Sequence, residues 1–315
     1  MTPRRPTAEL PAGPSAVQRS FDGGYGEGLD RGVSLGGGGL FFVAWQAAYL
    51  HTLASHGIRF EAADRLVGTS AGSVVAAAVA GGKLNRLHSE VSLLAKVPAL
   101  LSALAPASEL HPSQQRAADL FSSAGDSAPS TLRAIGHAAL AAVTPNPRIM
   151  RRNISVALGR IGWTSEALRI TCADAYTGER CVVTRSTCTS IPRAVAASSA
   201  VPGLFPPQPI GDRRCMDGGV SGTGTHLDLM AGAKRVLVLA LTDGSEMTEG
   251  MMTNHPGGSR QELADLEATG TSVLFRVPDR VDMLELMTPA AIPGALAMGG
   301  RQAYSDLGTL NTFWG

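Results

Sequence analysis

A five-residue pattern, Gly68-Thr69-Ser70-Ala71-Gly72, constrains the fold more than any other stretch of this chain. It matches G-x-S-x-G, in which a serine lies on a sharp turn between a strand and a helix. The serine adopts a strained backbone conformation in such an elbow, so Gly68 and Gly72 fit because they lack side chains. An apolar stretch precedes the pattern, and the alanine- and valine-rich run Val74–Ala80 follows it. We therefore expect a strand, a turn at Ser70 and a helix whose N-terminus faces the group that Ser70 attacks.

A second glycine-rich stretch, Gly36-Gly37-Gly38-Gly39, lies between a strand pattern at Gly32–Leu35 and a helix pattern at Leu40–Ser55. A phenylalanine stands where a dinucleotide-binding fingerprint needs a small residue, and the Gly-Lys-Ser/Thr of a Walker loop is missing. The remaining interpretation is an oxyanion hole, built from backbone N–H groups that no side chain shields. A flexible loop is the alternative, but four glycines entering a helix cost backbone entropy.

Length and charge exclude several classes of protein. The chain has 315 residues, enough for one large α/β domain or two smaller ones, and a formal net charge of +1. It contains no run of lysines or arginines, so we expect no nucleic-acid partner. Residues 32–58 carry no charged side chain, but their glycines, glutamine and histidines favour a buried loop and helix over a membrane span.

The cysteines do not form a metal-binding pattern. No C-x-x-C or paired Cys/His spacing links the four of them, Cys172, Cys181, Cys188 and Cys215. We expect reduced thiols in a cytoplasmic protein with no metal and no cofactor. The N-terminus also lacks the apolar core of a secretion signal.

Along the chain, residues 1–30 are rich in proline, glycine and polar residues and predict a disordered tail. Residues 31–315 are expected to form a single domain. Within it, 84–165 is a helical excursion with helices at Ser89–Leu104 and Ser113–Phe121, and it is a candidate lid over the active site. Helices that merely pack on the domain are the alternative.

The second half of the chain returns to strand patterns. A helix is predicted at Ile191–Ala200, and the expected strands are Leu168–Ala175, Arg180–Thr184, Arg213–Met216, Lys234–Leu241 and Ser272–Val277. The strand at Arg213–Met216 leads into Asp217-Gly218-Gly219. Two glycines after the aspartate would let the chain turn tightly and leave the carboxylate at the edge of the sheet. An ordinary loop with this composition is the alternative.

An activated serine needs a base within hydrogen-bond reach. None of the seven histidines lies in a recognisable motif, so Asp217 is the better candidate. A Ser–Asp–His triad in an ordinary α/β-hydrolase, using Ser70 with Asp217 or Asp243 and His255, is the competing interpretation. That fold needs several strands before the serine, and only 69 residues precede Ser70.

Four blocks in this order resemble the patatin-like phospholipase family: the glycine run, the Ser70 pattern, the segment Ala196–Pro207 and Asp217-Gly218-Gly219. The resemblance extends from about Val33 to Leu241. It implies a three-layer α/β/α fold with a central, mostly parallel sheet. It also implies a dyad in which Asp217 takes the proton of the nucleophile Ser70, and an oxyanion hole at Gly37, Gly38, Gly39 and Ala71.

One departure from the family pattern concerns the substrate. The family's glycine loop usually continues with a small residue, a basic residue and a glycine, and here Leu40 and Phe41 take the last two places. We therefore expect a serine hydrolase of acyl or lipid esters that prefers neutral esters to phospholipids and makes transient contact with lipid surfaces. An acyltransferase or thioesterase, and a non-catalytic binding protein on the same scaffold, are the alternatives.

Overall fold

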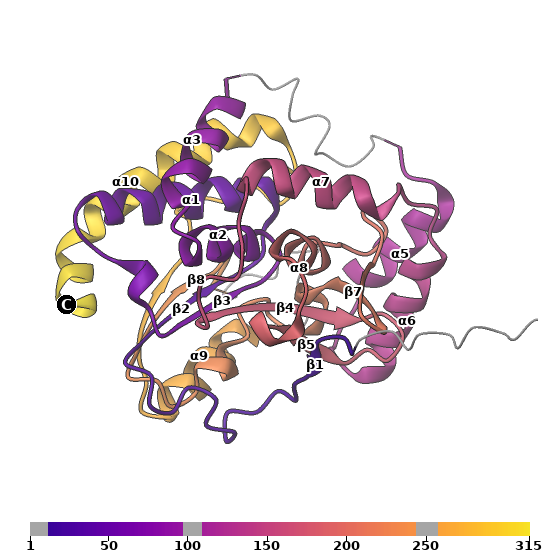
Figure 1. Ribbon diagram of the computed structural model, residues 1–315, viewed down its shortest axis with the longest axis horizontal. Coiled ribbons are helices and arrows are strands. Elements are labelled where there is room, and N and C mark those ends of the chain that lie inside the picture. Colours follow the sequence, from indigo (N-terminus) through magenta and orange to yellow (C-terminus); the bar gives the residue numbers. More distant parts are fainter. Residues whose placement is uncertain (1–11, 97–108, 244–257) are drawn as a thin grey trace, which may run out of the picture.

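A computed structural model describes residues 12–96, 109–243 and 258–315. Its centre is a sheet with the strand order β1-β5-β4-β3-β2-β8-β9. The five strands in the middle and at one edge run parallel: β4 (Leu168–Asp174), β3 (Arg65–Gly68), β2 (Arg31–Leu35), β8 (Arg235–Leu239) and β9 (Ser272–Arg276). Helices cover both faces (Figure 1), which gives the three-layer α/β/α fold expected from the sequence.

Four shorter strands pair antiparallel around β4. Both β5 (Arg180–Val183) and β7 (Arg213–Asp217) pair directly with β4. Beyond them, β6 (Gln208–Ile210) pairs with β7, and β1 (Ser15–Ala16) pairs with β5. β4 and β5 therefore form a hairpin, and the predicted strand that leads into Asp217 is confirmed.

The central strands are apolar throughout because both of their faces are covered. In β8, Leu237 and Leu239 belong to the larger hydrophobic cluster, which also contains the helices on one face of the sheet. Val236 and Val238 alternate with them and belong to a second cluster on the opposite face. All four side chains are fully buried, as expected for a parallel strand between two layers of helices.

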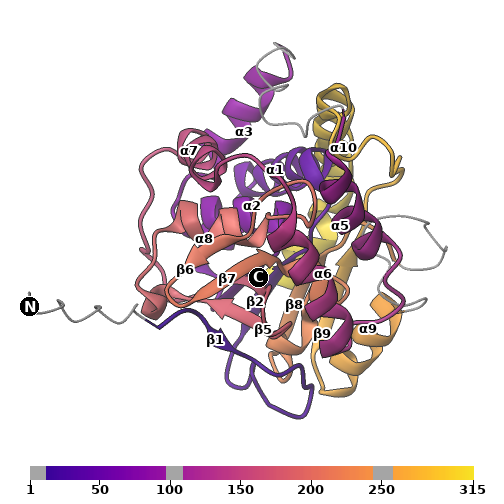
Figure 2. The same cartoon turned by 90° about the vertical axis from the view of Figure 1, so that its right-hand side faces the viewer.

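The helices that pack on the first face of the sheet include α1 (Gly39–Ser55), α2 (Ala71–Ala80) and α10 (Ile292–Trp314) (Figure 2). The long α10 lies beside α1 (Figure 1). Its Gln302 accepts a hydrogen bond of 2.7 Å from the Trp45 indole, and its Asp306 accepts one of 2.7 Å from the Tyr49 hydroxyl. The sequence interpretation missed α10, because the proline and the glycines in its first half look like loop residues.

The expected helical excursion contains α3 (Leu84–Leu94), α5 (Pro112–Ser122), α6 (Pro129–Ala141) and α7 (Pro147–Leu158). The helix predicted at Ser113–Phe121 lies within α5. The one predicted at Ser89–Leu104 was misplaced: α3 begins at Leu84 and ends at Leu94, and residues 97–108 lie outside the described part of the chain. The lid itself remains a prediction. Further along, α8 (Ile191–Ser198) confirms the predicted helix, and α9 (Gly258–Ala268) covers the second face of the sheet.

The prediction of a disordered tail over 1–30 is wrong for residues 12–30, and residues 1–11 lie outside the described part. We call residues 12–30 the N-terminal arm. Val17, Phe21, Tyr25 and Leu29 of this arm pack against the second hydrophobic cluster, and Ser15–Ala16 add strand β1 to the sheet. These apolar residues recur every fourth position. The proline-, glycine- and polar-rich composition of the segment drew attention away from this spacing. The arm packs on the cluster without forming a helix.

Within the described residues, no helix combines the length and the apolar character needed to cross a bilayer.

The packing of the arm predicts a measurable contribution to stability. Removing residues 1–30 should lower the thermal midpoint by roughly 5 °C or more, because apolar contacts with the second cluster are lost together with strand β1. Differential scanning calorimetry would measure the shift. Removing only residues 1–11 is the matched control and should shift the midpoint much less. Equal midpoints for the two truncated chains would contradict a structural role for the arm.

Candidate active site

Ser70 and Asp217 are brought together by the two strands that share one side of β4. On that side, β3 pairs with the first half of β4, and its last paired residue, Gly68, lies opposite Ile170. Next to it β7 pairs with the second half, where Asp217 lies opposite Cys172. Ser70 follows Gly68 by two residues, just as Cys172 follows Ile170. Ser70 and Asp217 therefore reach the same level of the sheet from opposite directions.

Ser70 occupies the strained turn that its sequence pattern predicts. Its backbone φ is 51°, a left-handed value that is costly for a residue with a side chain. The turn brings α2 so close to β2 that a side chain on Gly72 would collide with the carbonyl oxygen of Leu35. One on Gly68 would lie 2.6 Å from the carbonyl oxygen of Gly72. The two glycines of the elbow are therefore required by packing.

A residue outside the serine pattern also holds the elbow. The backbone N–H of Ser70 donates a hydrogen bond of 2.9 Å to the hydroxyl of Ser198, near the end of α8. Thr69, the residue before, exchanges a 2.7 Å hydroxyl contact with Thr171 of β4. These contacts fix the elbow relative to the strand that positions Asp217.

Asp217 is buried and only partly satisfied. Its side chain is 3% exposed, and its Oδ1 accepts a hydrogen bond of 2.7 Å from the backbone N–H of Gly219. Burial raises the pKa of Asp217 to about 7, although the hydrogen bonds from Gly219 and Ser70 oppose this rise. A carboxyl group with a pKa near neutral pH is suited to accept and return a proton.

The contact between the two side chains is loose. The Ser70 hydroxyl is near enough to lower the pKa of Asp217. Yet within the described residues Oδ2 of Asp217 has no partner that meets the full geometry of a hydrogen bond. Catalytic hydrogen bonds are often long before substrate binds and tighten in the complex. Oδ2 is thus the carboxylate oxygen left available for a proton.

The glycine loop lies beside the serine. Gly38 and Gly39 line a cavity together with Ser70 and Ala71, whereas Gly37 does not contribute to its wall. The loop is anchored just before these residues, because the carbonyl of Gly36 accepts hydrogen bonds from the Gln46 side chain at 3.0 Å and from a backbone N–H of α2 at 3.1 Å. Backbone N–H groups at the starts of α1 and α2 therefore flank the serine.

The cavity is almost entirely apolar. It has a volume of about 570 Å³, and Asp217 is the one charged residue among those that line it in the described part of the chain. Some of its walls come from α3, α5 and α7, so the helical excursion contributes residues to the cavity that Ser70 also lines. Aliphatic side chains on these walls include Leu87, Val91, Met150 and Ile154. Such a cavity accepts a hydrocarbon chain better than a polar group.

This arrangement agrees with the comparison of the chain with known families. The family model for patatin-like phospholipases matches residues 33–228, which is more than half of the chain. The chain belongs to the patatin-like phospholipase family. Membership supports lipid acyl hydrolase activity in general. Among curated proteins, none matches the chain.

One described histidine, His226, contacts the backbone of Gly218, next to Asp217 of this patatin-like site. No histidine lines the cavity among the described residues. His226 is fully buried, and burial together with Arg180 and Arg19 lowers its pKa well below the usual value, so it stays neutral. The triad considered from the sequence needs His255, which lies outside the described residues.

Sequence reasoning missed several residues of the patatin-like cavity. Ser198 and Ser199 lie in the Ala196–Pro207 segment, but nothing in that segment indicated that one would hold the elbow and the other would line the cavity. Gln114 of α5 is a buried wall residue whose amide donates to the carbonyl of Gly203 at 2.9 Å. The pair Ser198-Ser199 interrupts an alanine-rich run, but this pattern alone assigns neither role.

The described residues also bear on cofactors. They contain no group of three or more His, Cys, Asp or Glu side chains placed to hold a metal ion. Three of the cysteines, Cys172, Cys181 and Cys215, are buried next to one another across β4, β5 and β7. Contacts with the other two and burial raise the pKa of the Cys172 thiol well above its usual range. These cysteines are therefore core residues rather than ligands.

Proposed function

We propose that this protein is a serine acyl hydrolase that uses Ser70 as nucleophile and Asp217 as the only side-chain base. One observation carries the proposal: a strained, buried serine lies beside a buried carboxyl group with a pKa near 7, at the floor of an apolar cavity. The site therefore offers a nucleophile, a base and a pocket for an acyl chain without a histidine.

The first half-reaction forms an acyl-enzyme. Oδ2 of ionised Asp217 takes the hydroxyl proton as Oγ of Ser70 bonds to the acyl carbon. The carbonyl double bond opens, and its electron pair moves to the oxygen. When this intermediate collapses, the bond between the acyl carbon and the leaving oxygen breaks, and the alcohol departs with the proton held by Asp217. Asp217 is then ionised again for the second half.

The second half-reaction releases the acid. Asp217 takes a proton from water as the water oxygen attacks the acyl-enzyme. Oγ of Ser70 leaves with that proton, which restores the free hydroxyl. Both intermediates carry negative charge on the former carbonyl oxygen. We assign its stabilisation to backbone N–H groups of Gly37, Gly38, Gly39 and Ala71, helped by the positive end of α2.

The cavity favours a substrate with a long apolar portion. Val143 and Ile149 line it and remain 61% and 53% exposed, so its apolar surface continues to the outside of the molecule. An acyl chain could pass along this surface from a lipid aggregate to Ser70. Burial of the chain would supply binding energy in proportion to the apolar area covered.

Charge near the cavity bears on the rest of the substrate. Leu40 lines the cavity where the family pattern has a basic residue. Of other cations that could replace it, Arg65 donates a 2.7 Å hydrogen bond to the carbonyl of Leu229 and so is used elsewhere. Arg151 belongs to α7, but only its neighbours Met150 and Asn153, and not Arg151 itself, are among the residues that line the cavity. A neutral acyl ester is therefore the substrate that we favour over a phospholipid.

The dyad is tested by substitution. Ser70→Ala and Asp217→Asn should each lower kcat/KM for a neutral acyl ester by roughly 10³-fold or more, because the two residues act as a unit. His226→Gln should retain most of the activity. Steady-state kinetics on the folded variants would measure these effects. A His226→Gln variant as inactive as Ser70→Ala, with an unchanged midpoint, would contradict the proposed dyad.

The loss of activity expected in Asp217→Asn should not come from unfolding of the variant. Since burial raises the pKa of Asp217 from its ordinary value of about 4 to about 7, ionising this carboxyl weakens the folded state as pH rises through that interval. The neutral amide avoids this loss and its oxygen can still accept from Gly219. The variant should therefore be at least as stable as the wild type at pH 8.

Substrate preference is tested by competition. A neutral ester and a phospholipid with the same acyl chain should differ in kcat/KM, with the neutral ester ahead by roughly tenfold, because the cavity offers no cation to a phosphodiester. Arg151→Met measures the contribution of a candidate cation on α7, a helix that lines the cavity. A higher kcat/KM for the phospholipid that Arg151→Met abolishes would overturn the preference and assign head-group binding to Arg151.

A further inference from the structure

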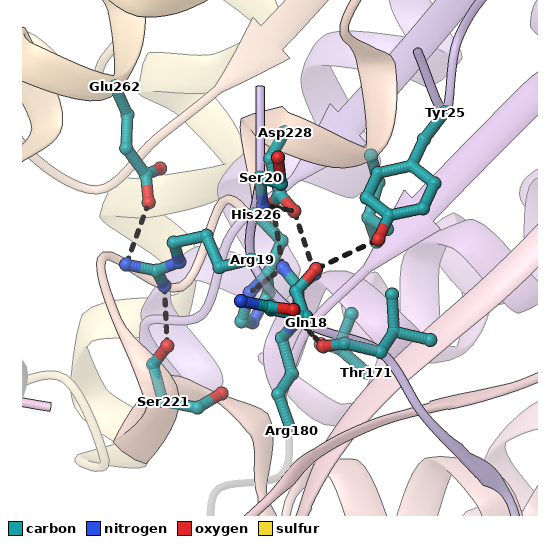
Figure 3. A network of polar contacts seen from close by, with 12 residues as sticks. Gln18, Arg19, Ser20, Tyr25, Thr171, Arg180, Ser221, His226, Asp228 and Glu262 are labelled. Atoms are coloured by element: carbon teal, nitrogen blue, oxygen red, sulfur yellow. Dashed lines mark hydrogen bonds and ion pairs between the residues drawn. The ribbon is translucent and has the colours of Figure 1, made fainter. Parts of the chain in front are cut away.

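The Asp217 turn is held from behind by the N-terminal arm. Asp217 opens a short 3-10 helix, Gly218–Ser221, and the backbone N–H of Gly219 inside it donates to Oδ1 of Asp217 at 2.7 Å. The last carbonyl of this helix, that of Ser221, accepts a hydrogen bond of 2.5 Å from the guanidinium of Arg19 (Figure 3). Arg19 thus contacts the turn at the end opposite to the carboxylate.

The guanidinium of Arg19 sits in a space that the sequence keeps open. Gly222, directly after the 3-10 helix, has a φ of 141°, and a side chain there would overlap the guanidinium of Arg19. Arg19 also pairs with Glu262 of α9 at 3.3 Å, and the Glu262 side chain is only 7% exposed. A buried carboxylate that loses its cation is strongly unfavourable, so this pair keeps Arg19 in place.

Glu262 connects the pair to the segment that follows the turn. Its Oε2 accepts hydrogen bonds from the hydroxyls of Thr223 at 2.5 Å and Thr225 at 3.1 Å. The carbonyl of Thr225 in turn accepts a 2.6 Å hydrogen bond from Ser34 of β2, the strand that leads into the glycine loop. Arg19 and Glu262 therefore bridge the Asp217 turn to the strand on the other side of Ser70.

Backbone contacts fix the arm on both sides of Arg19. Arg180 of β5 donates from its guanidinium to the carbonyls of Val17 and Gln18, both at 3.1 Å, and forms a two-pronged pair with Asp228 at 2.6 and 2.7 Å (Figure 3). Asp228 also accepts from the backbone N–H of Ser20 at 3.3 Å. Backbone contacts before and after Arg19 thus set the position of its side chain.

We infer that Arg19 is a positioning residue for the base: by holding the Ser221 carbonyl and Glu262, it keeps the Asp217 turn in the geometry that meets Ser70. Arg19 touches no reacting atom, and its effect on turnover rests on the proposed function. Small displacements of a base from its nucleophile cost large factors in rate. The arm is therefore part of the catalytic scaffold as well as of the fold.

The kinetic test replaces Arg19 by methionine in the full-length chain. Arg19→Met should lower kcat for a neutral acyl ester by roughly tenfold or more with KM within about twofold, because the dyad loosens while the acyl cavity is unchanged. Arg19→Lys should recover part of the loss, since an ammonium can still donate to the Ser221 carbonyl. Arg59→Met is the matched control. It removes an exposed ion pair with Glu61 and should leave kcat near the wild-type value.

Hydrogen exchange tests the contact between Arg19 and the Asp217 turn without measuring catalytic activity. The segment 217–222 should exchange its amide hydrogens faster in Arg19→Met than in Arg59→Met. Equal exchange in these two variants, or a wild-type kcat in Arg19→Met, would overturn the inference. If the wild-type chain shows no turnover that depends on Ser70, the proposed function is contradicted but the inference about Arg19 is not. The exchange rates would still decide whether Arg19 holds the turn.

Gly222 supplies a second variant, which perturbs the same contact while Arg19 is still present. Gly222→Ala should lower kcat by itself, because its methyl group displaces the guanidinium. In an Arg19→Ala background the same change should cost clearly less, since the space is then free, and such non-additivity is a direct measure of the contact. Full additivity of the two substitutions would contradict the assignment.

Discussion

The site depends on the point along β4 at which its pairing with β3 ends and its pairing with β7 begins. β3 delivers the Ser70 elbow from one end, and β7 delivers Asp217 from the other. Because a sheet fixes the register of its strands, the separation of Ser70 and Asp217, the nucleophile and base that we propose, is set by backbone hydrogen bonds rather than by flexible side chains. The contacts between Thr69 and Thr171 and between Ser70 and Ser198 then lock the elbow at that level.

Burial gives this geometry its chemistry. An aspartate in water is too acidic to be an effective base at neutral pH, but the removal of Asp217 from water raises its pKa to about 7. The same apolar surroundings form the cavity above Ser70. The apolar side chains around the site thus both raise the pKa of Asp217 and form the cavity that we propose binds an acyl chain.

The parts of this structure that rest on local pattern could be predicted from the sequence. The strand, elbow and helix around Ser70 follow from two glycines whose spacing has a steric cause, and β8 follows from an uninterrupted apolar run. Asp217 was identified because a strand pattern ends at it and two glycines follow. Its elevated pKa cannot be predicted from local pattern, since the extent of its burial depends on residues far away in the chain.

Features that depend on distant contacts escaped sequence reasoning. The arm has the composition of a disordered tail, yet Arg19 and four regularly spaced apolar residues tie it to the sheet. α10 has a proline and several glycines that local rules assign to loops, but Trp45 and Tyr49 of α1 provide it with specific partners. Ser198 looks like any helix-terminal serine until the fold places it against Ser70. In each case the decisive partner lies more than 120 residues away.

The central claim is that Ser70 is activated by Asp217 alone, and the pH dependence of its labelling tests this most directly. A fluorophosphonate probe should modify Ser70 at a rate that rises with pH through a single ionisation near pH 7 and then levels off, because only the ionised carboxylate can take the proton. Peptide mass spectrometry would locate the adduct. In Asp217→Asn this pH-dependent labelling should disappear. Labelling of Ser70 that keeps the same rate and pH profile in Asp217→Asn would contradict the account.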